Sequence, residues 1–370
     1  MTTSIVDYFI SLVKIDSESK NEKLIAEKLK HDLEELGAKV EIDNSAERIG
    51  SNTGNIIAYF DGEISKKPIM FCAHMDTVKP GNGIKPQIKE DRIITDGTTI
   101  LGSDDKSGIA EIIWAIKELK EENEKTAPFE ILFTVCEEIG LLGAKNVDPK
   151  KFKSEIGFAL DSHKVGEITN QAPYQNSMKF TIFGKEAHAG VEPEKGINAI
   201  KIAAVAISNM KIGRIDDETT CNIGIIEGGK ATNIVPNKVV IKAEVRSHNL
   251  EKLENVTKRM KSAFDKAAKL YNSSIEAIIV REYNAFKIEK NNIVVELAKN
   301  AADNLNIKFK TVIGGGGSDA NILNLKGMEM VIAGSGMSAV HTVEEYILIK
   351  ELEDGAKWVK EIIKIYSKQQ

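Results

Sequence analysis

The chain has 370 residues, of which 42% are hydrophobic and 28% charged. This length and composition are typical of a folded globular protein of about two domains and exclude a disordered chain. Fifty basic and fifty-five acidic side chains give a net charge of -5. Because this balance lacks the basic excess that attracts phosphate backbones or anionic lipid, we expect neither nucleic acid nor a membrane as a partner.

The apolar runs are far shorter than the ~20 residues of a membrane-spanning helix. The N-terminal segment carries Asp7, Asp16 and Glu18 and does not match a signal peptide, so we expect a cytoplasmic location. Three cysteines are too few for a disulfide framework.

Helices and strands alternate in the first part of the chain. Leucine and isoleucine at helical spacing predict a helix over Ser19–Leu36. The next predicted elements are strands at Lys39–Ile42, Asn55–Phe60 and Ile69–Ala73, a helix at Lys106–Lys120, and a strand at Phe129–Val135. The nearly continuous apolar strands indicate a sheet covered by helices on both faces, with functional residues at the carboxyl ends of its strands.

The pattern changes between about Met178 and Tyr283 to the βαββαβ order of ferredoxin-like domains. The elements are Met178–Phe183, Ile197–Met210, Thr220–Ile226, Val239–Val245, Leu250–Tyr271 and Ile275–Val280. The α/β pattern then resumes with Asn292–Leu305, Phe309–Ile313, Glu329–Ala333 and a terminal helix, Val343–Ser367. We therefore predict an α/β domain of residues 1–176 and 289–370, interrupted by an inserted α+β domain of residues 177–288.

Titratable side chains stand at the ends of the predicted strands of the α/β part. His74 and Asp76 follow one strand, and the alternation of an extended chain puts both on one side. Taken alone, such a pair is more often a hydrogen-bonded strand end than a metal site. Asp104-Asp105 precedes a helix, where an N-cap is an equally good interpretation.

Glu137-Glu138 follows a buried strand, where paired carboxylates need a cation or solvent. Asp161 ends another apolar run, and His341 lies in a turn before the last helix. Imidazole with carboxylate ligands suits Zn²⁺, or Mn²⁺ and Co²⁺ less well. These candidate ligands provide one histidine and one carboxylate for each of two ions, and one further carboxylate that can bridge them. This count predicts two ions ~3.5 to 4 Å apart.

These motifs resemble those of the dinuclear zinc peptidase superfamily, which includes peptidase T, glutamate carboxypeptidase and aminoacylase, with peptidase T the nearest branch. The matching segments are His74–Val78, Leu101–Gly108, Cys136–Gly140, His341, and in the inserted part Gly184–Gly190 with Gly196–Ala199. The resemblance implies a zinc-peptidase catalytic domain with a mixed sheet, an inserted lid and dimerisation domain, and a homodimer formed through that lid.

The resemblance also implies roles for individual residues. One zinc ion would be bound by His74 and Asp161 and the other by Glu138 and His341, with Asp104 bridging the two. It further implies a cis peptide bond between Asp104 and Asp105.

Asp76 would orient the ring of His74, and Glu137 would be the general base. His188 would donate a hydrogen bond to the oxyanion across the dimer, although a lone surface histidine is the simpler interpretation without the resemblance. The residues expected near the substrate are Asn233, Arg246, Gly316 and Ser318; a salt bridge at a strand end is an equal alternative for Arg246.

An aspartate as third ligand, here Asp161, accompanies aminopeptidases and acyl-amino-acid hydrolases in the superfamily. We therefore expect an aminopeptidase that releases the N-terminal residue of short peptides, such as tripeptides. The alternatives are an N-acyl amino acid amidohydrolase with the same ligands and a catalytically silent metal-binding protein, which the presence of Glu137 disfavours. A nucleotide-binding protein is disfavoured because Gly314–Gly317 lacks the ending of a phosphate-binding loop.

Overall fold

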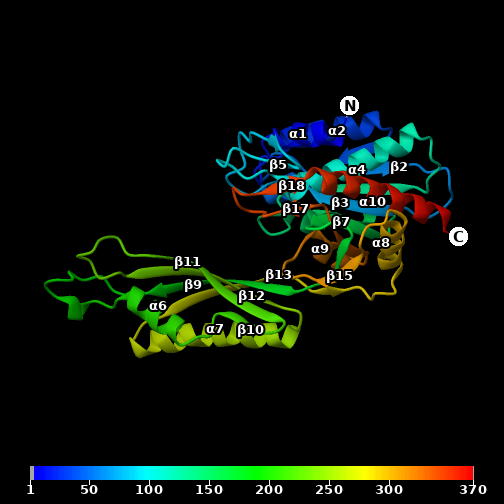
Figure 1. Ribbon diagram of the computed structural model, residues 1–370. Coiled ribbons are helices and arrows are strands. Elements are labelled where there is room, and N and C mark those ends of the chain that lie inside the picture. Colours follow the sequence, from blue (N-terminus) through cyan, green and yellow to red (C-terminus); the bar gives the residue numbers. More distant parts are fainter. Residues whose placement is uncertain (1–3, 370) are drawn as a thin grey trace. The chain divides into compact units, whose positions relative to one another are not determined.

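The structure is a computed structural model that describes residues 4–369 (Figure 1). It divides into two compact units, each described here by itself. The first unit contains the residues up to Gln171, Phe286–Gly314 and the residues from Ser318 onward; the second contains Ala172–Ala285 and Gly315–Gly317. Within residues 4–369 no helix has the length and apolar character needed to span a membrane.

A nine-stranded mixed sheet forms the centre of the first unit, in the order β1-β2-β6-β3-β7-β16-β8-β14, with β15 paired to β8. The strands are β1 Lys39–Ile42, β2 Ile56–Phe60, β3 Ile69–His74, β6 Phe129–Thr134, β7 Ile156–Ser162, β8 Glu167–Ala172, β14 Phe286–Lys287, β15 Lys310–Ile313 and β16 Glu329–Gly334. The four neighbours β6, β3, β7 and β16 are parallel, so their carboxyl ends lie at one edge.

The helices of the first unit are α1 Ile5–Val13, α2 Lys23–Glu35, α3 Ser45–Ile49, α4 Ser103–Glu121, α5 Leu142–Asn146, α8 Ile293–Asn304, α9 Asp319–Leu325 and α10 Ile349–Lys368, with a short 3-10 turn at Pro149–Lys151. Helix α4 packs against β3 and β7, and α1 and α10 pack against α4. A small second sheet joins β17 Met337–Ser338, β18 Tyr346–Leu348, β5 Arg92–Ile94 and β4 Gln87–Lys89.

The second unit has a five-stranded antiparallel sheet in the order β10-β11-β12-β9-β13, with α6 and α7 packed against it (Figure 1). Its elements are β9 Tyr174–Phe183, a 3-10 turn at Pro193–Lys195, α6 Ala199–Ser208, β10 Gly213–Asp216, β11 Thr219–Gly228, β12 Lys238–Ser247, α7 Leu250–Leu270 and β13 Ile275–Tyr283. Phe180 stacks on Phe264 in the apolar core between sheet and helices. Apart from the short edge strand β10, this is the predicted βαββαβ order.

The predicted fold class, an α/β domain interrupted by a ferredoxin-like α+β domain, is confirmed. Two helix boundaries were predicted wrongly. The helix predicted from Ser19 begins at Lys23, because Lys20 has a left-handed backbone with φ 78°. The helix predicted from Val343 begins at Ile349, because the preceding residues form strand β18 and pair with β17 and β5.

Candidate metal centre

The carboxyl ends of three parallel strands bring most of the predicted ligands together. His74 is the last residue of β3, Asp161 lies near the end of β7, and Glu137 and Glu138 follow β6. Asp104 stands at the start of α4, which packs against β3 and β7. The site therefore forms where the chain leaves the sheet, as expected for an open α/β sheet.

The carboxylate of Asp104 lies between two imidazole rings. Its Oδ1 atom is 2.9 Å from Nε2 of His74, and its Oδ2 atom is 3.1 Å from Nε2 of His341. The same His341 nitrogen is 3.1 Å from Oε1 of Glu138. One carboxylate thus contacts both histidines through different oxygens, which is the arrangement that a bridging ligand requires.

Asp161 completes the cluster on the His74 side. Ligand atoms of His74, Asp104 and Glu138 lie within 4.8 Å of one another, and so do those of His74, Asp105 and Asp161. The peptide bond between Asp104 and Asp105 is cis, as the resemblance implied.

The tautomer of His74 is set by its surroundings. Its Nδ1 atom lies 2.9 Å from the backbone carbonyl oxygen of Asp76, which can only accept a hydrogen bond. Nδ1 therefore carries the proton, and Nε2 is the atom directed toward Asp104 and available to a metal ion.

The Asp76 carboxylate lies 3.5 Å from Nδ1 of His74, and it also accepts three hydrogen bonds. It accepts hydrogen bonds from the backbone N–H groups of Glu137 (2.8 Å) and Glu138 (3.2 Å) and from the hydroxyl of Ser19 (2.7 Å). Asp76 consequently fixes the turn that presents the two glutamates.

Several carboxylates lie close together in this buried cluster, and both burial and their mutual repulsion raise the pKa values of most of them. Burial raises the pKa of Glu137 well above its usual value, and the charge of Asp161 raises it further. Burial, followed by the charge of Asp104, likewise raises the pKa of Asp161. Burial also raises the pKa of Glu138, although its hydrogen bond with His341 opposes this.

The pKa values of the two histidines are also raised, which in their case favours the charged form. Hydrogen bonds with Asp104 and Glu138 raise the pKa of His341 to about 10. Burial lowers the pKa of His74, but its hydrogen bonds with Asp104 and Asp76 outweigh burial and raise it above the usual value. For Asp104, hydrogen bonds with His341 and His74 outweigh burial and hold its pKa well below the usual range.

This donor set fits divalent cations. Two imidazoles and several carboxylates meet in a buried place without a lysine or arginine in direct contact with Asp104 or Glu138 among the described ion pairs. Buried Oδ1 of Asp105 also has no hydrogen-bond partner within the described residues. Positive charge supplied by metal ions would relieve the carboxylate repulsion, and N/O ligands of this kind suit zinc.

In the second unit, His188 and Asn233 lie on adjacent segments. His188 forms a β-bridge with Ile234, and the N–H of Ala189 donates to the carbonyl oxygen of Asn233 (2.9 Å). Both His188 and Asn233 are exposed.

Arg246 forms a salt bridge with Glu244, as one of the two interpretations of its sequence position predicted. Its Nε and Nη2 atoms donate to the two carboxylate oxygens of Glu244 at 3.0 and 3.1 Å, and its Nη1 atom lies 3.4 Å from the carbonyl oxygen of Gly315. Gly316 lies beside the same Nη1 atom. Ser318 is the N-cap of α9, where its buried hydroxyl accepts the N–H of Ala320.

Three buried acids with hydrogen bonds to this part of the first unit were not predicted from the sequence. Glu22 accepts the N–H and the thiol of Cys136, directly before Glu137. Asp319 accepts the hydroxyl of Thr134, and burial raises its pKa to about 6. Glu345 holds the loop that carries Asp104. Nothing in their sequence neighbourhoods marks these residues, apart from the position of Glu345 four residues after His341.

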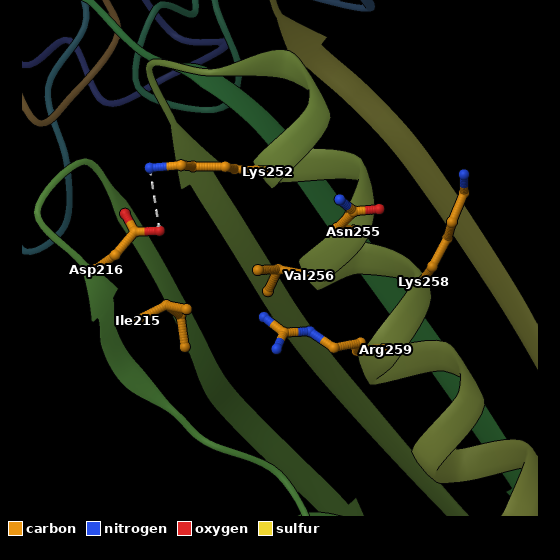
Figure 2. Close-up of a pocket in the computed structure, with 7 residues that line it drawn as sticks. All are labelled: Ile215, Asp216, Lys252, Asn255, Val256, Lys258 and Arg259. Carbon is orange, nitrogen blue, oxygen red and sulfur yellow. Dashed lines mark ion pairs between the residues drawn. The ribbon is translucent and has the colours of Figure 1, made fainter.

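A separate pocket of about 490 Å³ lies on the second unit between β10 and α7 (Figure 2). It is lined by Ile215, Asp216, Lys252, Asn255, Val256, Lys258 and Arg259. Lys252 reaches across it to Asp216, with 3.4 Å between Nζ and Oδ2. None of the predicted site residues lines this pocket.

Comparisons with known proteins agree with the geometry. Residues 175–272 match the family model described as a peptidase dimerisation domain, of the M20 type, and residues 80–185 match the model of M42 glutamyl aminopeptidase. The crystal structure of aminopeptidase PepT from Bacillus cereus is 44% identical, with a TM-score of 0.87 and coverage of 97% of both chains. The chain belongs to the peptidase T-like members of the M20 peptidases.

Two further peptidase T-like proteins cover nearly the whole chain. The crystal structure of a tripeptidase from Staphylococcus aureus is 39% identical, with a TM-score of 0.93 and coverage of 99% of this chain and 98% of that chain. Peptidase T from Fusobacterium nucleatum is 30% identical over 92% of this chain and 90% of its own length. We assign the chain to the M20 family because these matches cover nearly all of it, whereas the M42 match covers only residues 80–185.

Proposed function

We propose that this protein is a metallo-aminopeptidase that releases the N-terminal residue of short peptides, with tripeptides as the main substrates. The observation that carries the proposal is the Asp104 carboxylate shared by His74 and His341, with Glu137 close to the same cluster. The peptidase T-like relatives, which are described as aminopeptidase PepT and as a tripeptidase, support the substrate class.

We assign the centre two zinc ions, for which Mn²⁺ or Co²⁺ could substitute. His74 and Asp161 would hold one ion, Glu138 and His341 the other, and Asp104 both. Ions bound there supply positive charge that makes a water molecule more acidic and polarises the scissile carbonyl group.

Glu137 is the proposed general base. Burial raises its pKa well above the usual value, which makes its carboxylate a stronger base. It would take the proton of the attacking water and deliver it to the nitrogen of the leaving peptide. The backbone of Glu137 is positioned by Asp76, whose carboxylate accepts a hydrogen bond from the Glu137 N–H.

The second unit supplies the remaining proposed contacts. His188 would donate a hydrogen bond to the developing oxyanion, and its exposed position is compatible with a role across a homodimer formed by this unit. The match to a peptidase dimerisation domain over residues 175–272 supports such a dimer. Arg246 bonds Glu244 through Nε and Nη2, so its Nη1 group beside Gly316 would be available to a substrate carboxylate. Asn233 would contact the peptide.

Steady-state kinetics test the proposal. The zinc-loaded protein is compared on tripeptides with a free N-terminus, the same tripeptides N-acetylated, and N-acetylated single amino acids. We expect kcat/KM to be highest for the free tripeptides. Faster turnover of the N-acetylated amino acids would instead identify an N-acyl amino acid amidohydrolase, which would use the same ligands.

Glu137→Gln separates an enzyme from a silent metal-binding protein. This variant is expected to keep its zinc and its fold and to lose several orders of magnitude in kcat, since general-base catalysis alone contributes ~10² to 10⁴-fold. Unchanged turnover would remove Glu137 from the mechanism.

A further inference from the structure

Glu345 is a buried carboxylate on the segment that carries His341. It is 1% exposed and directly precedes strand β18, which pairs with β17 and β5. Its backbone N–H donates to the carbonyl oxygen of Thr342 (3.2 Å), so the residues from His341 to Glu345 form a compact turn. This hydrogen bond ties the backbone of Glu345 to that of Thr342, the residue directly after His341.

Four donors from the loop before α4 converge on the Glu345 carboxylate. Its Oε2 atom accepts the backbone N–H groups of Leu101 (2.8 Å) and Gly102 (2.9 Å). Its Oε1 atom accepts the hydroxyl of Ser103 (2.6 Å) and the backbone N–H of Asp104 (3.1 Å). Both oxygens are thus occupied, and Glu345 is not available as a metal ligand.

The backbone of this loop is shaped to receive an anion. Gly102 is left-handed (φ 73°), and Asp104 departs from helical geometry with ψ 100°. Neighbouring N–H groups in such a loop can point to one side and form a concave anion-binding surface. Because its acceptor is charged, each of these hydrogen bonds is stronger than one between neutral groups.

We propose that Glu345 is a positioning residue of the metal centre, whose carboxylate fixes the backbone of Asp104 relative to His341. The inference rests on the proposed function, because it assumes that Asp104 and His341 are metal ligands. The Asp104 side chain starts from the backbone that Glu345 holds, and its two oxygens reach His74 and His341. Metal-ligand distances tolerate only ~0.2 Å of error, so a loosened loop weakens metal binding.

Glu345→Gln tests the proposal with zinc affinity as the main readout. Glutamine keeps the size of the side chain but turns one acceptor oxygen into an NH₂ group facing N–H donors. We expect zinc affinity, measured by chelator competition, to fall about 10 to 100-fold, as is typical when a group supporting a metal ligand is lost. Hydrogen exchange of the amides of Leu101, Gly102 and Asp104 should become faster. Ser103→Ala removes one of the four donors to Glu345 and should weaken zinc binding less. It provides the same test if the glutamine variant does not fold.

Glu130→Gln is the matched control. Glu130 is 2% exposed in the same unit and accepts the N–H groups of Lys153 (3.0 Å) and Ser154 (2.9 Å) and the hydroxyl of Ser154 (2.6 Å). It lies near the start of β6, whereas Glu137 follows the end of that strand. A general loss of stability should therefore lower the unfolding midpoint in this variant and leave zinc affinity unchanged.

The outcomes separate the two proposals. Wild-type zinc affinity in both Glu345→Gln and Ser103→Ala would overturn the role of Glu345 while leaving the peptidase intact. An equal loss of affinity in Glu130→Gln would also overturn it, because the effect would then be general destabilisation. A wild-type protein that binds no zinc and cleaves no tripeptide would instead refute the proposed function itself.

Discussion

Replacing Glu111 by methionine should stabilise the protein. Glu111 lies in α4 with no exposed surface, and within the described residues neither of its carboxylate oxygens has a hydrogen-bond partner. Gly355 of α10 faces it so closely that a Cβ atom there would lie 2.2 Å from the carboxyl carbon. Burial, followed by the charge of Glu351, raises the pKa of Glu111 well above the usual 4.5.

The sign and size of the effect follow from this environment. Because the folded state holds the Glu111 proton more tightly than the unfolded state, stability is lost as the pH rises above 4.5 toward the raised pKa. The loss can reach about 1.4 kcal/mol per pH unit. A buried carboxyl without a partner costs about 1 to 3 kcal/mol. Methionine has a similar size and no charge, so we expect Glu111→Met to gain about 2 to 3 kcal/mol at pH 7.

Urea unfolding at pH 5, 7 and 8, with the metal content held constant, measures the effect. The advantage of Glu111→Met over the wild type should grow with pH. Glu111→Gln is the control: it removes the titration but keeps an unpartnered polar group, so it should lose the pH dependence while gaining less stability than the methionine variant. A methionine variant less stable than the wild type at pH 7, or an advantage that is the same at pH 5 and 8, would refute the reasoning.

Three further variants test the glycine loop, the cap of helix α9 and the core of the second unit. Gly317→Ala should raise the KM for tripeptides by displacing the glycine loop, because its Cβ atom would lie 2.3 Å from the ring of Tyr283; an unchanged KM would contradict this. Ser318→Ala should lower the unfolding free energy by about 1 kcal/mol through loss of the α9 cap, whereas a rise in KM without destabilisation would favour substrate contact by Ser318. Phe264→Ala removes the stack on Phe180 and should destabilise the second unit by about 3 to 5 kcal/mol in thermal unfolding; a change below 1 kcal/mol would mean that this core tolerates the cavity.

The cluster of histidines and carboxylates could be predicted from the sequence because these residues follow strands of plainly apolar character. Parallel strands bring their carboxyl ends together, so His74, Glu138 and Asp161 could be placed at one edge from the strand pattern alone. The bridging role proposed for Asp104 came from the resemblance, since a carboxylate before a helix is equally well an N-cap.

The supporting acids could not be predicted in the same way. Glu345 and Glu22 act through backbone N–H groups of distant segments, and a backbone donor leaves no mark in the sequence. The small sheet that includes β17 and β18 was missed because strands of 2 and 3 residues are too short to show alternation. For the same reason the last helix was predicted to start too early, at Val343.

The central claim is that the cluster around Asp104 works by holding divalent cations. Its most direct test is the cleavage of a tripeptide with a free N-terminus by protein stripped with a chelator and then titrated with zinc. We expect stripping to abolish cleavage and activity to return as zinc rises to two equivalents per chain. Undiminished cleavage by the stripped protein would contradict it.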